Sequence, residues 1–115
     1  KELMANKLVG VTYTGSATQS PPVPTDGMLL SGFIPNAAFN GTTVTFQWSA
    51  DQDGGGTYID VKETDGSAVS YTVAANKLTR VDPSGWAFAS TGSIRFVSGA
   101  TEDTSSAITV LLRDA

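Results

Sequence analysis

The chain has 115 residues, with neither cysteine nor histidine, and its 7 Lys and Arg residues against 11 Asp and Glu residues give a net charge of −4. This composition excludes disulfides, thiolate metal sites and any Ser-His-Asp or Cys-His catalytic site. The basic residues are scattered, which argues against nucleic-acid binding, and no apolar run approaches the roughly 20 residues of a membrane-spanning helix.

The length predicts one domain, which we place at residues 4–115. Lys1, Glu2 and Leu3 precede Met4, so we interpret residues 1–3 as a remnant ahead of the natural start. No basic segment followed by an apolar one is visible after Met4, as a signal peptide would require. Synthesis in the cytoplasm is therefore expected.

Short alternating or β-branched runs, bounded by turn residues, follow one another along the whole chain. Such runs are typical of β-strands. The expected strands are 7–14, 28–34, 42–50, 57–63, 69–74, 77–81, 92–98 and 107–113. Their number and spacing predict an all-β fold, a two-sheet antiparallel β-sandwich or jelly-roll-like domain of about eight short strands.

The segment between the first two strands, residues 15–27, reads GSATQSPPVPTDG. Its closely spaced prolines disfavour a central strand and favour polyproline II. One interpretation is a strap that runs from one sheet edge to the next strand of the same chain. The other is an assembly arm that docks on a neighbouring subunit, formed by Pro21, Pro22, Val23 and Pro24.

The strand TTVTFQWSA shows the clearest period of two. Val44, Phe46 and Trp48 share one face, which predicts that all three belong to the core. Trp86 follows an Asp-Pro-Ser-Gly turn instead, so we expect it to be more exposed than Trp48. Trp86 and Tyr58 are therefore the candidates for surface contact or for stacking on a sugar.

Residues 49–60, SADQDGGGTYID, combine aspartates with consecutive glycines. Counted from Asp51 as a calcium loop of the EF-hand type, Gly55 lacks the side-chain oxygen needed at position 5 and Lys62 replaces the glutamate at position 12. The segment resembles the Asp-box hairpin, Ser-x-Asp-x-Gly-x-Thr-Trp, with two residues inserted and Tyr58 in place of Trp. That resemblance implies a rigid turn in which the aspartate binds turn amides; a weak surface calcium site is the alternative.

Six carboxylates could in principle form a glycosidase pair. They are Asp60, Glu63, Asp65, Asp82, Glu102 and Asp103. On a small sandwich rich in turns, such groups are usually solvated loop residues. We therefore predict no catalytic residue, no metal ligand and no cofactor, and we rank a small hydrolase last among the functions considered.

Three segments, at residues 32–61, 78–101 and 107–115, resemble small β-sandwich virion structural proteins of tailed bacteriophages. The shared features are a Thr-Phe-Gln strand before a glycine-rich hairpin, an Asp-Pro loop with Gly-Trp, an Ile-Arg-Phe strand and a final strand ending in arginine. The resemblance covers about two thirds of the chain and contains no catalytic signature.

That resemblance implies a non-enzymatic virion protein, made in the host cytoplasm and located in the virion. It would be a capsid decoration or cement protein, or a tail-associated one, bound to the major capsid protein or to other virion proteins. A homo-oligomer, with a trimer favoured, is expected, and residues 8–14 could join the sheet of another subunit or of their own. The alternative function is a carbohydrate-binding module or host-adhesion domain of a tail or fibre, which would bind a glycan through Trp86 and Tyr58.

Overall fold

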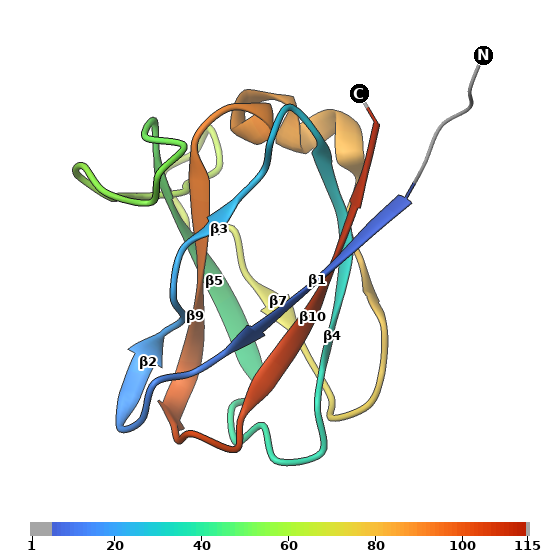
Figure 1. The fold of residues 1–115 in the computed structure, drawn as a ribbon. Helices are drawn as coiled ribbons and strands as arrows, with labels where there is room; N and C mark the ends of the chain where they lie inside the picture. Colours follow the sequence, from blue (N-terminus) through green and yellow to red (C-terminus); the bar gives the residue numbers. More distant parts are fainter. Residues whose placement is uncertain (1–5, 115) are drawn as a thin grey trace.

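The computed structural model describes residues 6–114, so the interpretation of residues 1–3 and of Met4 lies outside the described residues. Two antiparallel sheets pack face to face, which confirms the predicted all-β sandwich (Figure 1). One sheet has four strands in the order β1-β10-β4-β8. The other has six, in the order β2-β9-β5-β6, with β3 also paired to β9 and β7 to β5.

Every expected strand is present, although several are shorter than predicted. The strands are β1 (Asn6–Thr12), β2 (Ala17–Gln19), β3 (Val23–Pro24), β4 (Leu29–Pro35), β5 (Thr43–Ser49), β6 (Ile59–Asp60), β7 (Tyr71–Thr72), β8 (Thr79–Arg80), β9 (Ser93–Glu102) and β10 (Ala107–Arg113). Two of them, β2 and β3, were not predicted, and neither was a 3-10 helix, η1 (Pro83–Ser90).

The proline-rich segment folds back on its own chain as an edge of the six-stranded sheet. In β2, Gln19 pairs with Val97 of β9, and in β3, Val23 pairs with Ile94. The side chain of Val23 is fully buried in the core. The segment thus corresponds to the strap of the first interpretation. Of the residues predicted as an assembly arm, Pro21, Pro22, Val23 and Pro24, the side chain of Val23 is buried in the core of its own chain and is not available to a partner.

Aromatic rings fill the space between the two sheets. The rings of Phe33, Phe46 and Phe96 meet edge to face, with centroids 5.3 Å to 5.9 Å apart, a favourable arrangement for π-systems. The buried apolar positions of β5, β9 and β10 recur with a period of two. They are Val44, Phe46, Ile94, Phe96, Ile108, Val110 and Leu112.

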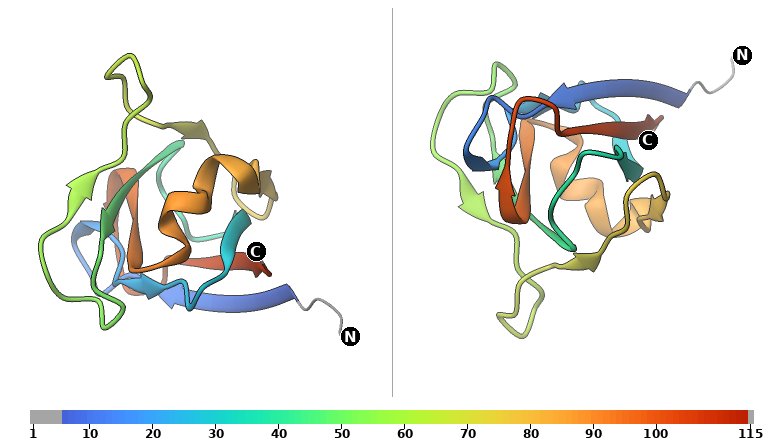
Figure 2. Two further views of the ribbon diagram at one scale, coloured as in Figure 1. Left: turned by 90° about the horizontal axis from the view of Figure 1, so that it is seen from above. Right: turned by 90° about the horizontal axis from the view of Figure 1, so that it is seen from below.

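The 3-10 helix η1 lies across one end of the sandwich (Figure 2, left). Asp82 caps it by accepting from the Ser84 amide at 3.2 Å and from the Ser84 hydroxyl at 2.9 Å, and Pro83 supplies a backbone angle suited to its first turn. This turn directs the indole of Trp86 inward, where only 3% of its surface is exposed. The prediction of an exposed Trp86 is wrong, because the end of the sandwich needs a large side chain to close it.

Trp48 lies at the end of β5 and is only half-buried. Its indole N–H donates to the Thr91 carbonyl at 2.9 Å, and its ring meets Phe88 at 6.1 Å between centroids. The predicted order of burial is therefore reversed: Trp86 belongs to the core and Trp48 reaches the surface.

Candidate functional site

Glu102, at the end of β9, is completely buried. Its Oε1 accepts from the Asn40 amide at 2.8 Å, while Oε2 accepts from the Gly41 amide at 2.8 Å and from the Ser98 hydroxyl at 2.6 Å. The prediction that Glu102 is a solvated loop group is wrong, because β9 continues beyond Ser98 and carries this residue into the sheet. All these partners belong to the turn between β4 and β5 or to β9 itself, so the carboxylate ties that turn to the six-stranded sheet.

Tyr13 lies near this carboxylate and is itself buried, with its O–H donating to the Phe96 carbonyl at 2.9 Å. Burial, and secondly the negative charge of Glu102, raise the pKa of the Tyr13 phenol far above its usual value. The raised pKa favours the neutral phenol in the folded protein over the ionised form.

This raised pKa predicts a loss of stability at alkaline pH. The contribution of Tyr13 is fully present below about pH 10, where an unfolded tyrosine ionises, and it is lost as pH rises further, because only the unfolded chain then releases the proton. The free energy of unfolding is expected to fall by about 1.4 kcal/mol for each pH unit above about 10. Urea unfolding at several alkaline pH values measures this slope. The same slope in Tyr13→Phe would contradict the assignment.

Two exposed carboxylates, those of Asp65 and Asp103, cap their own turns. Asp65 accepts from the Ser67 hydroxyl at 2.6 Å and the Ser67 amide at 2.9 Å, and Asp103 does the same for Ser105. In each case the serine hydroxyl first, and then the serine amide, lower the pKa of the carboxyl group. For Asp65 and Asp103, the predicted role as loop residues is confirmed.

The glycine-rich hairpin is a rigid turn, as the Asp-box resemblance implied. Asp51 Oδ1 accepts from the Asp53 amide at 2.8 Å, and the Ser49 hydroxyl donates to the Gly55 carbonyl at 2.8 Å. Gly54 has a φ of 85°, a backbone angle that favours glycine. Across residues 6–114, no three acidic side chains gather in a way that could hold a metal ion.

Tyr58 is not available as a free stacking platform. The guanidinium of Arg95 covers one face of its ring at 3.9 Å from the centroid, and the Tyr58 hydroxyl donates to the Gly54 carbonyl at 2.8 Å. Since Trp86 is buried at the end of the sandwich, the two predicted sugar-stacking residues do not form one surface. This finding removes the geometric basis of the predicted glycan contact.

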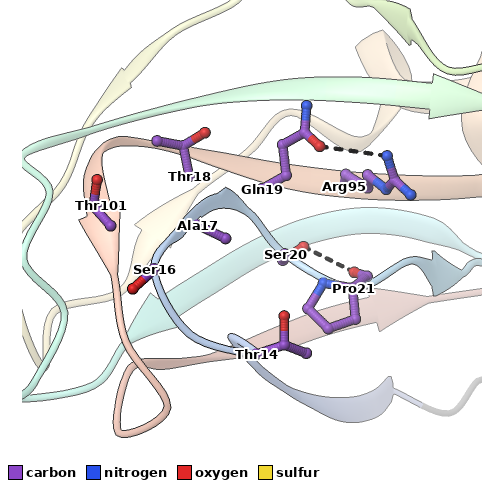
Figure 3. Close-up of a pocket in the computed structure, with 9 residues that line it drawn as sticks. All are labelled: Thr14, Ser16, Ala17, Thr18, Gln19, Ser20, Pro21, Arg95 and Thr101. Carbon is purple, nitrogen blue, oxygen red and sulfur yellow. Dashed lines mark hydrogen bonds between the residues drawn. The ribbon is translucent and has the colours of Figure 1, made fainter.

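A shallow polar pocket of about 520 Å³ lies beside Arg95, where Gln19 accepts from the guanidinium at 3.5 Å (Figure 3). Hydroxyl groups dominate its lining. The lining residues are Thr14, Ser16, Ala17, Thr18, Gln19, Ser20, Pro21, Arg95 and Thr101. Because ligand pockets usually have a mainly apolar lining, this one is a weak candidate for holding a small molecule.

A stronger candidate is an apolar surface that we call the aromatic corner, formed by Trp48, Ile59 and Phe88. Ile59 is 60% exposed and Phe88 is 46% exposed. Together with Val61 and the flanking Asp60 and Lys62, they line a groove of about 220 Å³. Ile59 and Phe88 were not predicted as site residues, because neither residue shows a local pattern that distinguishes a surface role from a core one.

The two aromatic side chains of the aromatic corner, Trp48 and Phe88, pack against neighbouring residues. The ring of Phe88 stacks on that of Trp86 at 5.5 Å with an interplanar angle of 28°, and Trp86 is itself wedged against Phe46 at 4.6 Å. The hydrogen bond from Trp48 to the Thr91 carbonyl fixes the second indole. Exposed apolar side chains of this kind contact partners with little loss of side-chain entropy.

Searches against protein-family models, curated proteins and solved structures found no match to this chain. The resemblance to virion proteins therefore stays a prediction. None of the helices within residues 6–114 is both long and apolar enough to span a membrane.

Proposed function

We propose that this protein is a non-enzymatic structural component of a bacteriophage virion, specifically a decoration protein bound to the capsid surface. The observation that carries the proposal is the aromatic corner, an exposed apolar surface on a rigid sandwich. The resemblance of residues 32–61, 78–101 and 107–115 to virion proteins supplies the class of partner.

The chemistry of the aromatic corner favours a protein partner. Aromatic side chains near the centre of an interface contribute much of its binding energy. Phe88 and Ile59 would supply this apolar centre, while Asp60 and Lys62 would form part of the polar rim. The corresponding site on the major capsid protein is expected to be an apolar depression into which Phe88 inserts.

Binding to particles that lack the protein tests this contact. Wild-type protein is expected to sediment with such particles, and Ile59→Lys and Phe88→Ser are expected to weaken binding about tenfold or more. Leu78→Lys is the matched control, because Leu78 is also an exposed apolar residue, 51% exposed, but lies outside the aromatic corner. Equal binding by Ile59→Lys, Phe88→Ser and wild type would remove the aromatic corner as the contact.

Mass spectrometry of purified particles tests the virion assignment itself. A decoration protein should be present at a copy number that is a simple fraction of that of the major capsid protein, because it follows the symmetry of the shell. A few copies per particle would favour a tail location instead. Absence from the particle, together with failure to bind it, would contradict the virion assignment.

A further inference from the structure

The edge formed by β1 differs from the other sheet edges in the described part of the chain. β8, β6 and β7 are two residues long, and Pro21 and Pro22 separate β2 from β3. Short strands and prolines are devices that prevent an edge from pairing with another chain. β1 instead runs for seven residues in unbroken register with β10 and contains no proline. It lies along one margin of the molecule (Figure 2).

The backbone groups on the outer side of β1 can be identified from the register. In an antiparallel pair, successive residues direct their N–H and C=O groups alternately toward the partner strand and away from it. The Tyr13 amide, which continues the β1 register, donates to the Ser106 carbonyl at 3.0 Å. On this alternation, the residues whose groups point outward are Asn6, Leu8, Gly10 and Thr12.

The side chains on this edge suit a second strand. Leu8 is 67% exposed, the largest value among the exposed large apolar residues. Gly10 has open space where a Cβ would be. Lys7, a residue type that often protects edges, forms an ion pair with Asp26 at 3.2 Å, so its charge is partly balanced within the same chain.

We propose that β1 pairs antiparallel with β1 of a second copy of this chain, forming a two-fold symmetric dimer. Centring the pair on Val9 places Leu8 opposite Gly10 of the second copy and Asn6 opposite Thr12. This register pairs all the outward-facing residues of both strands and joins the two four-stranded sheets into one continuous sheet.

Three features favour a second copy over a different chain. The exposed Leu8 would lie across the side-chain-free Gly10 of its partner, so the same edge supplies both the apolar group and the space for it. Each Lys7 would face Val11, and the two lysines would stand about 13 Å apart along the strands, which avoids like-charge contact. A two-fold interface also closes on itself without further surfaces.

The trimer that was favoured from the sequence is harder to form through the β1 edge. A ring of three needs β1 to pair with a different edge of the next copy, and the other edges in residues 6–114 are two residues long or interrupted by prolines. The β1 edge belongs to the four-stranded sheet, whereas the aromatic corner is built on η1 and on strands of the six-stranded sheet. The dimer is therefore independent of the proposed virion contact.

Sedimentation equilibrium between about 1 μM and about 500 μM tests the dimer. Wild-type protein is expected to reach twice the chain mass within this range. Leu8→Lys and Gly10→Pro should raise the dissociation constant at least about tenfold, since the first introduces a charge at the interface and the second removes an outward N–H. Leu78→Lys makes the same change at another exposed leucine of this protein and should leave the constant unchanged. Monomers throughout the range, or a dimer insensitive to both β1 substitutions, would overturn the proposal.

Disulfide cross-linking tests the register. Because the chain has no natural cysteine, only the introduced cysteines can form a disulfide. An equimolar mixture of Leu8→Cys and Gly10→Cys is expected to form mainly the mixed disulfide, because residues facing each other in a hydrogen-bonded antiparallel pair have Cα atoms about 5.5 Å apart. Each variant oxidised alone should cross-link more slowly. Preferential linkage of position 8 to position 8 would overturn the antiparallel register centred on Val9.

Discussion

Glu102→Ala is expected to lower the free energy of unfolding by about 3–5 kcal/mol. The substitution removes a buried carboxylate that accepts hydrogen bonds from the amides of Asn40 and Gly41 and from the hydroxyl of Ser98. Each buried donor left without a partner costs about 1–3 kcal/mol, and the alanine side chain leaves a cavity besides.

The matched control is Glu63→Ala, the same change at an exposed glutamate. Surface substitutions of this kind usually change stability by less than about 0.5 kcal/mol. Urea unfolding followed by circular dichroism measures both variants. A cost for Glu102→Ala no greater than that for Glu63→Ala would show that the buried network contributes nothing to stability.

Two further variants separate the contribution of the hydrogen bonds from that of close packing around Glu102. Glu102→Gln keeps the shape of the side chain but replaces one acceptor oxygen with an NH₂ group. Its free energy of unfolding should therefore lie between those of the wild type and Glu102→Ala. Gly41→Ala leaves the carboxylate intact but adds a Cβ that would collide with the Ser98 hydroxyl. This second variant is also expected to destabilise the fold, because the turn must move away from Glu102.

Trp86→Ala is expected to cost about 3–5 kcal/mol, the range found for large aromatic residues in a core. The indole closes the end of the sandwich against Phe46 and carries the stacked ring of Phe88. Trp48→Ala should cost less, because its side chain is only partly buried and its loss removes one hydrogen bond to Thr91 and one ring contact.

Fluorescence distinguishes the two indoles independently of stability. In Trp86→Phe the remaining Trp48 is expected to be quenched readily by iodide, whereas in Trp48→Phe the buried Trp86 should be protected. Equal quenching of the two variants, or stronger quenching of Trp86, would contradict the burial described here. Near-ultraviolet circular dichroism confirms that each variant retains its tertiary structure before quenching is compared.

The local features of the fold are determined by the sequence itself. Period-two alternation in β5 placed Val44 and Phe46 in the core, because successive side chains of a strand point to opposite faces. The glycine-rich turn after Ser49 was likewise predictable, since its aspartate and positive-φ glycines act within a few residues of one another. Such features depend on residues close together in the chain, so they can be predicted without knowledge of the fold.

The burial of Glu102 and Trp86 and the pairing of the strap with β9 depend on the tertiary structure. Glu102 is buried because the Asn40–Gly41 turn, far away in sequence, presents two amides to it. Trp86 is buried because the sandwich has an open end beside Phe46. The strap forms β2 and β3 because β9 offers an unpaired edge to it. In each case the stabilising partner is distant in the sequence, so no local period or turn signal could reveal it.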